Sequence, residues 1–257
     1  MTDYRQPLYR HYVSKFKRSE CSPQLAAEET AWPYFDQKYL KHIRHLGPDD
    51  AILDVGCGSG GLLAYLAQKG FRCAEGVDVS EEQVELAKAR SLRVRCGDVF
   101  GFLESRVEAF KAVIALDFVE HFTKEEALSL FALLFRALKP GGILLIQTPN
   151  GQGLFSGQVI YGDLTHCTVF TPESLSQALR LAGFDHIVFD ETGPVPMTVT
   201  GAVRLLLWRG IKRAANFIRL VEAGKRQSIW TENVICACRK PAPSGSLGAS
   251  QTEATTN

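Results

Sequence analysis

The 257-residue sequence lacks any apolar run near the length of about 20 residues that a membrane-spanning helix needs. Its N-terminal segment also lacks the apolar core of a secretory signal, so we expect a cytoplasmic protein. A charge excess of either sign is missing too, since 29 basic residues face 28 acidic ones. This balance does not favour a polyanionic partner, and we expect no binding to nucleic acid.

Cysteine motifs for metal binding are also missing. The seven cysteines are odd in number, scattered, and without a CxxC pair, which argues against a zinc site or a disulfide framework. We therefore expect reduced thiols. The sequence does have an ordinary globular composition, with 46% apolar and 22% charged residues over a length that can bury a substantial core.

From residue 51 onwards, short apolar runs alternate with amphipathic stretches. We expect strands at 51–55, 72–77, 92–95, 112–116, 142–147, 186–190 and 233–239, and helices at 62–69, 80–90, 123–138 and 172–182. A turn is expected at 139–142, where Lys-Pro-Gly-Gly occurs. Repeated β-α-β units predict a single Rossmann-like α/β domain with a mostly parallel seven-stranded sheet flanked by helices.

We divide the chain into three parts. Residues 1–47 are predicted to form an amphipathic helical cover rich in aromatic residues, packed on the domain. In an alternative interpretation, one or two of its tyrosines overhang a ligand site. Residues 48–240 form the α/β domain. The remaining residues, 241–257, have no aromatic side chain and are rich in Ser, Thr, Gly, Pro and Ala, so we expect disorder there.

The segment LDVGCGSGG places four glycines directly after the first predicted strand. Glycines let a ligand touch the backbone and permit positive φ, and open α/β sheets bind ligands beyond the carboxyl ends of their strands. Gly56, Gly58 and Gly61 also fit the dinucleotide fingerprint, which leaves an NAD-dependent oxidoreductase as an alternative. Asp54 argues against that alternative, because its charge would repel a pyrophosphate and suits a cationic ligand.

Five motifs occur together in a characteristic order. They are LDVGCGSG (53–60), GVDVS (76–80), GDV (97–99), LDFVEHF (116–122) and LKPGGILLIQTPN (138–150). Over about residues 46–189 the sequence resembles the class I S-adenosylmethionine-dependent methyltransferases. Glu120-His121, Thr165-His166 and Phe170-Thr171 resemble the branch that contains ubiquinone-type and sugar O-methyltransferases.

The resemblance implies S-adenosylmethionine as cofactor and assigns residues to its methionine end. Gly56, Gly58 and Gly60 would approach the methionine moiety. Asp54 would help to hold the ammonium group, through water or backbone. Asp117 would line this end of the cofactor.

The resemblance also implies how the nucleoside end is held. Asp78 would accept hydrogen bonds from both ribose hydroxyls, as a carboxylate can. Asp98 would receive the adenine amino group, and Val99 would donate its backbone N–H to the ring.

Methylation of a hydroxyl benefits from a general base, and histidine is the usual choice near neutral pH. Of the six histidines, His121 and His166 follow predicted strands at the catalytic edge. We favour His166 as the base because its loop is polar, while His121 is equally suited to shaping the pocket. Asp117 and Asp163 nearby are also metal-ligand types, but such groups collect in any active site, so no metal is expected.

We therefore predict a methyltransferase that acts on oxygen, by in-line transfer to a hydroxyl of a small, glycan-linked or lipid-linked acceptor. A phenolic quinone precursor is the alternative acceptor within this class.

Residues 201–226 hold seven basic residues and one acidic residue. An apolar stripe at helical spacing, formed by Leu207, Ile211, Ala214, Ile218 and Val221, predicts an amphipathic helix inserted before the last strand. We favour a helix that lies on the core with its basic face in solvent. The alternative is a lid over an anionic or lipid-linked acceptor, in peripheral contact with a membrane surface.

Overall fold

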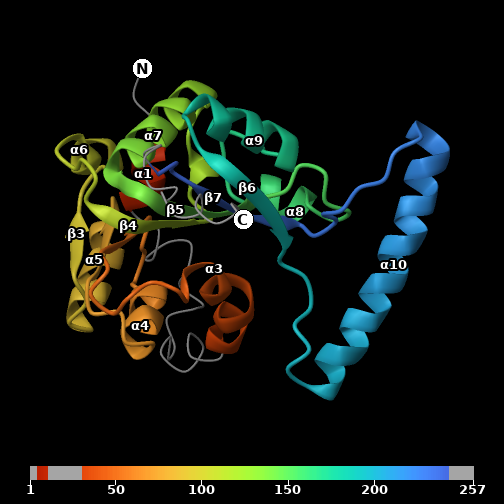
Figure 1. Cartoon of the computed structure of the whole chain (residues 1–257), viewed down its shortest axis with the longest axis horizontal. Coiled ribbons are helices and arrows are strands. Elements are labelled where there is room, and N and C mark those ends of the chain that lie inside the picture. The colour runs from red at the N-terminus through yellow and green to blue at the C-terminus, as the bar shows by residue number, and fades with distance from the viewer. Residues whose placement is uncertain (1–4, 11–30, 243–257) are drawn as a thin grey trace, which may run out of the picture.

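The computed structural model describes residues 5–10 and 31–242, and a seven-stranded sheet lies at its centre in the order β3-β2-β1-β4-β5-β7-β6 (Figure 1). The strands are β1 (Ile52–Val55), β2 (Ala74–Asp78), β3 (Val94–Cys96), β4 (Phe110–Leu116), β5 (Leu138–Pro149), β6 (Asp185–Glu191) and β7 (Asn233–Arg239). The pairs from β3 to β5 are parallel, and only β7 runs antiparallel to its neighbours. The predicted mostly parallel α/β sheet is confirmed.

In the part of the chain that the structure describes, several α-helices cover the two faces of the sheet. The helices include α1 (Arg5–Arg10), α3 (Lys41–Ile43), α4 (Gly61–Gln68), α5 (Glu81–Ala89), α6 (Val99–Glu104), α7 (Lys124–Ala137), α8 (Gly157–Tyr161), α9 (Pro172–Leu181) and α10 (Val199–Ala223), with a π-helical turn η2 (Asp36–Leu40) and a 3-10 turn η3 (Val119–His121). Buried side chains of α6, α7 and α9 form one core with the sheet, and those of η2, α3 and α4 form the other. This two-sided burial explains the continuous apolar runs of the central strands.

Local sequence signals position the helix starts. Thr123 and Thr171 each form a capping box with the residue three positions later, and Ser80 accepts the N–H of Gln83. Such caps satisfy backbone donors that a helix leaves unpaired at its first turn. The helices therefore begin within a residue or two of their predicted positions.

Two predictions of local structure are wrong. Residues 139–142 do not separate a helix from a strand, because β5 already begins at Leu138 and the four residues form an irregularity inside it, with Gly141 at φ +73°. The segment 201–226 does form a helix, but α10 does not lie on the core: none of its residues is buried.

The predicted cover and tail are only partly described. Of residues 1–47, the described parts are 5–10 and 31–47, and residues 243–257 of the predicted disordered tail lie outside the described residues. Among the described helices, none is long and apolar enough to cross a bilayer.

Candidate active site

A cavity of about 650 Å³ opens at the carboxyl ends of β1, β2 and β4. Its walls come from the glycine loop after β1, the end of β2, residues 97–100, residues 116–122 and helix α1. The volume is within the range of sites for small molecules and cofactors, and the position is where parallel α/β sheets bind ligands.

The predicted glycines divide into two roles. Gly56 (φ +72°) and Gly58 (φ +52°) line the cavity, and both backbones lie in the region that favours glycine. A Cβ on Gly56 would collide with the Phe118 ring, whereas one on Gly58 would stand in nearly open space. Gly60 (φ +82°) does not line the cavity; a Cβ there would collide with Leu92, so this glycine permits close packing beneath the loop.

Asp78 connects the glycine loop to β2. One carboxylate oxygen accepts the N–H of Gly58 at 2.9 Å, and the other accepts the N–H of Ser80 at 2.8 Å. Burial raises the pKa of the Asp78 carboxyl despite these hydrogen bonds. A carboxylate offers about four lone-pair sites, so Asp78 can still accept hydrogen bonds from a diol in the cavity that it lines.

Asp54 has no direct access to the cavity, so its expected contact with the ammonium group, through water or backbone, stays a prediction. It is buried within β1 and is not among the residues that line the cavity. Burial, and secondarily the charge of Asp78, raise the pKa of Asp54 well above its ordinary value. Any contact with a ligand would have to pass through the loop above it.

Asp98 and Val99, which the sequence analysis expects at the nucleoside end, line the cavity together with three phenylalanines that the sequence analysis did not select. Asp98 also caps α6, since its carboxylate accepts the N–H of Gly101 at 3.0 Å. Phe122 packs edge-on against Phe100 and Phe118, with ring centroids 5.6 and 5.0 Å away. In the sequence, this wall is indicated by the two phenylalanines of LDFVEHF, which lie on either side of His121.

Asp117 lines the cavity from the end of β4, with φ at +49°. Both of its carboxylate oxygens accept from the side-chain amide of Gln147, at 3.1 and 3.0 Å. The amide oxygen of Gln147 in turn accepts the hydroxyl of Tyr39 at 2.6 Å. The N-terminal cover is thus connected to the predicted methionine end of the site.

His121 lines the cavity, and a hydrogen-bond chain fixes its tautomer. The single hydroxyl proton of Thr165 is donated to Asp163 at 2.6 Å, so the Thr165 oxygen accepts from His121 Nδ1 at 2.8 Å. Nδ1 therefore carries the proton in the neutral ring, and the backbone of Asp117 is a further hydrogen-bond partner of the ring. Burial, and then the charge of His166, lower the pKa of His121 to about 4, so the ring is neutral near pH 7.

His166 lies behind His121 instead of on the cavity wall. The two rings meet edge-on with centroids 4.9 Å apart. Nδ1 of His166 donates to the carbonyl oxygen of Ile160 at 3.0 Å, since a carbonyl can only accept. The structure thus brings the two predicted histidines together, but exposes only His121 to the cavity.

Glu120 is a further ionisable group that the sequence analysis did not select as a site residue. It is 1% exposed; one carboxylate oxygen accepts from Thr148 at 3.0 Å, and the other has no hydrogen-bond partner among the described residues. That second oxygen lies 4.0 Å from Nε2 of His166. Burial, and then the charge of Asp117, raise the pKa of Glu120 to about 8.

These three side chains are also of the types that bind metals. Ligand atoms of Glu120, His121 and His166 lie within 4.8 Å of one another. Each of the three already has a protein partner on another of its polar atoms. The arrangement could hold a divalent ion, so the expectation that no metal takes part stays a prediction, which a chelator tests.

The raised pKa of Glu120 predicts a pH-dependent stability. Below about pH 4.5 the Glu120 carboxyl is neutral in both the folded and the unfolded protein. Between about pH 4.5 and about pH 8, Glu120 keeps its proton only in the folded protein. Stability should therefore fall across this window by roughly 3–5 kcal/mol relative to Glu120→Gln. Urea unfolding at several pH values measures this difference, with the exposed Glu125→Gln as control; parallel pH profiles of wild type and Glu120→Gln would contradict it.

Helix α1 covers the mouth of the cavity. Both guanidinium nitrogens of Arg5 lie 2.8 Å from the carboxylate of Glu126, and one of them also donates to the backbone oxygen of His121 at 2.8 Å. The Tyr9 ring stands edge-on to the His121 ring, with centroids 6.0 Å apart, and both tyrosine and arginine line the cavity. The structure therefore supports the alternative interpretation, in which a tyrosine of the N-terminal segment overhangs the site.

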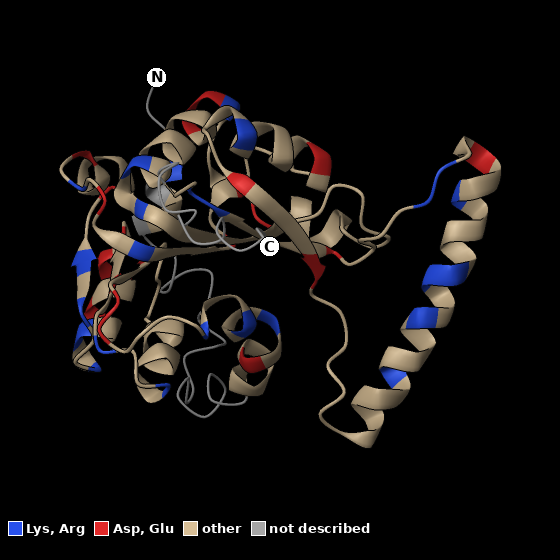
Figure 2. Cartoon of the chain, in the orientation of Figure 1, with Lys and Arg blue, Asp and Glu red and all other residues tan. Residues whose placement is uncertain are grey.

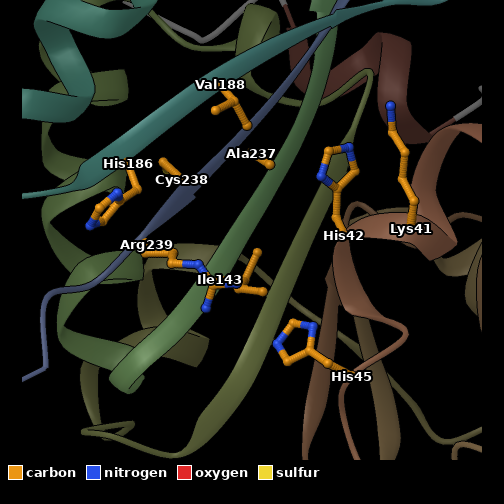
Figure 3. Close-up of a pocket in the computed structure, with 9 residues that line it drawn as sticks. All are labelled: Lys41, His42, His45, Ile143, His186, Val188, Ala237, Cys238 and Arg239. Carbon is orange, nitrogen blue, oxygen red and sulfur yellow. The ribbon is translucent and has the colours of Figure 1, made fainter.

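A second, smaller cavity of about 350 Å³ lies between α3 and the strands β5, β6 and β7 (Figure 3). Figure 3 shows His42, His45 and His186 around it, three of the four histidines that the sequence analysis left without a role. The carboxylate of Asp190 lies 2.8 Å from Nζ of Lys41 and 3.1 Å from Nε2 of His42. Ile143 in its wall is far from the end of β5 at Pro149, so this cavity is separate from the histidine pair and the glycine loop.

Comparison with known proteins identifies the family. A family model described as a methyltransferase domain matches residues 17–188, more than half of the chain. The chain therefore belongs to this family and carries a class I S-adenosylmethionine-dependent methyltransferase domain. The alternative of an NAD-dependent oxidoreductase is excluded by this result.

Individual relatives show what the chain is similar to. It is 32% identical over 159 residues to phosphoethanolamine N-methyltransferase 1 of Arabidopsis thaliana, an alignment that covers 57% of this chain and 31% of the relative. The chain spans about a third of the length of the curated relatives it matches first.

Solved structures show the same fold. A SAM-dependent methyltransferase from Archaeoglobus fulgidus superposes with a TM-score of 0.64 at 20% identity, over 93% of this chain and 100% of that one. Phosphoethanolamine N-methyltransferase 2 of Haemonchus contortus, solved with phosphomonomethylethanolamine and S-adenosylhomocysteine, has a TM-score of 0.58 at 19% identity, over 91% and 60% of the two chains.

Proposed function

We propose that this protein transfers a methyl group from S-adenosylmethionine to a hydroxyl of a small, glycan-linked or lipid-linked acceptor, with His121 as general base. One observation carries the proposal. The His121 ring lines the cavity, is neutral near pH 7, and is held by the hydrogen bond between its Nδ1 and the Thr165–Asp163 pair, so Nε2 is the nitrogen that we assign to take the proton of an acceptor.

The cavity fits the cofactor by its own chemistry. Gly56 and Gly58 bring bare backbone to its wall, and Asp78 supplies a carboxylate that suits two ribose hydroxyls. Asp98, Val99 and the phenylalanine wall would hold the adenine. When bound, S-adenosylmethionine supplies a methyl group that is already activated for transfer.

Catalysis then depends on the residues on the acceptor side of the site. Alignment of the hydroxyl and exclusion of water supply most of the rate enhancement in such a transfer. Arg5 and Tyr9 cover the mouth of the cavity, which limits the entry of water. His121 Nε2 takes the proton of the hydroxyl, and Asp163 stabilises the resulting imidazolium through Thr165.

Asp163 is suited to that stabilising role. Burial acts to raise the pKa of its carboxyl, but the hydrogen bonds from Thr165, together with the charges of His121 and His166, lower the pKa overall. The carboxylate is therefore ionised at neutral pH. We propose that His166 positions His121 through the edge-on ring contact and is not itself the base.

Two other acceptors are alternatives to the proposed hydroxyl. The likeness to phosphoethanolamine N-methyltransferases supports an amine as the second candidate. A phenolic quinone precursor stays an alternative within hydroxyl methylation. An amine that is protonated in solution would have to lose a proton before it attacks the methyl group. A hydroxyl instead loses its proton as the new bond forms.

Transfer of a labelled methyl group to defined acceptors tests the proposal. We expect transfer from labelled S-adenosylmethionine to a hydroxyl in a panel of monosaccharides, glycolipids and catechols, with the O-methyl product identified by mass spectrometry. EDTA should leave the rate unchanged. Transfer to phosphoethanolamine alone would contradict a hydroxyl acceptor, and loss of activity in EDTA with recovery on adding a divalent ion would contradict a metal-free base.

A further inference from the structure

Helix α10 is 25 residues long, and none of its residues is buried. It connects β6 to β7 and stands beside the sheet edge, away from the helices that cover the two sheet faces (Figure 1). A soluble helix normally gains its stability by burying an apolar stripe against a core. α10 makes only sparse contact with the other elements, so its apolar residues are not used in this way.

One narrow side of α10 attaches it to the domain. Trp208 lies against Gly193, Lys212 pairs with Glu191 at the end of β6, and Asn216 accepts the N–H of Gln227 at 2.8 Å. These three residues are spaced four apart, so they share one face of the helix. The attachment fixes which side of α10 points away from the domain.

The outward side is apolar and broad. It includes Val203, Leu206, Leu207, Phe217, Ile218 and Val221, all of them exposed. Leu207 is 61% exposed, Phe217 68% and Val221 74%. Part of this side is the stripe that the sequence analysis placed on the core; the structure turns it outward instead.

Basic residues border the apolar side. At 100° per residue, Arg209 and Arg213 follow one edge and Arg204 follows the other. Figure 2 shows basic positions along α10, with an acidic one at its C-terminal end, and residues 201–226 hold seven basic residues and one acidic one in all.

We propose that α10 docks this protein on a membrane surface that contains anionic lipids. A helix with a broad apolar face and cationic borders lies in the interface plane, with its apolar side chains in the acyl boundary and its cations among the headgroups. A second copy of the chain is a poorer occupant, because pairing two such helices would bring their arginines together. Docking therefore uses both the exposed apolar side of α10 and the arginines that border it.

Docking would also orient the active site. β6 runs parallel to β5, since both are antiparallel to β7. The chain therefore leaves β6 for α10 at the same sheet edge where β5 ends beside the site. A protein held by α10 would keep its catalytic edge close to the lipid surface, although the binding itself does not depend on which acceptor is methylated.

Vesicle co-sedimentation of the full chain tests the proposal. We expect binding to vesicles of phosphatidylcholine with 30% phosphatidylglycerol at least about tenfold stronger than to phosphatidylcholine alone. Leu207→Glu/Phe217→Glu should reduce binding to the anionic vesicles by about tenfold or more. Arg209→Gln/Arg213→Gln should remove most of the preference for the anionic lipid.

A matched variant controls for added charge. Val107→Glu/Leu181→Glu changes two equally exposed apolar residues outside α10 and should bind vesicles within about threefold of wild type. Thermal unfolding and S-adenosylhomocysteine affinity check that each variant folds. Wild type that binds neither vesicle, or a Leu207→Glu/Phe217→Glu variant that binds like wild type, would overturn the proposal; a dimer that this variant dissociates, without vesicle binding, would assign α10 to self-association.

Discussion

Asp78→Ala is expected to weaken S-adenosylhomocysteine binding by roughly 10²- to 10⁴-fold. Hydrogen bonds to a charged group contribute about 1.5–3 kcal/mol each, and this carboxylate would accept two from the ribose. The variant also deprives the Gly58 N–H of its acceptor, which loosens the loop around the methionine moiety. Isothermal titration calorimetry measures the change.

Two further variants separate these effects. Asp78→Asn keeps one carbonyl oxygen as acceptor and should lose less affinity than Asp78→Ala. Asp49→Ala removes an exposed carboxylate that pairs with Arg72 far from the cavity, and should leave the affinity unchanged. Affinity of Asp78→Ala within threefold of wild type would show that the cofactor does not use this carboxylate.

His121→Ala is expected to lower kcat by about 10²–10⁴-fold, the usual contribution of a general base. S-adenosylhomocysteine affinity should change only a few-fold, because the adenine and ribose contacts lie elsewhere. Thr165→Val should show a smaller loss, since it keeps the ring but removes the link to Asp163 that fixes the tautomer. Steady-state kinetics with an acceptor identified by the labelled-methyl assay, together with calorimetry, give both readouts.

The second histidine provides the comparison. His166→Ala should lower kcat less than His121→Ala, because His166 acts through the His121 ring and does not line the cavity. His186→Ala, at an exposed position in β6, should have no effect. A larger loss in His166→Ala than in His121→Ala would return the base assignment to His166, and equal losses of kcat and cofactor affinity in His121→Ala would make that residue structural.

The sheet could be predicted from sequence because its signals are local. Apolar runs, capping boxes at Thr123 and Thr171, and the order of β-α-β units together leave few topologies. The orientation of α10 could not be predicted in the same way. Helical periodicity shows that an apolar face exists, but what covers that face depends on where the chain returns to the sheet.

The candidate site could be predicted in part. Motif positions place Gly56, Gly58, Asp78, Asp98 and Asp117 at strand ends, and all of them line one cavity. Asp54 and Gly60 belong to the same motif but do not line the cavity, since Asp54 is buried in β1 and Gly60 packs closely against Leu92, and motif spacing does not distinguish these positions.

The acceptor side was harder to predict. Tyr9 reaches His121 from more than a hundred residues away, and the raised pKa of Glu120 arises from burial between β4, β5 and the 163–168 loop. Contacts of this kind are set by tertiary packing and leave no pattern in the local sequence.

A crystal structure with bound S-adenosylhomocysteine tests the central claim most directly. The account predicts that the ribose hydroxyls lie on the Asp78 carboxylate, that Gly56 and Gly58 border the homocysteine moiety, and that the sulfur faces the side of the cavity lined by His121. A ligand with its ribose away from Asp78, or with its sulfur turned from His121, would contradict it.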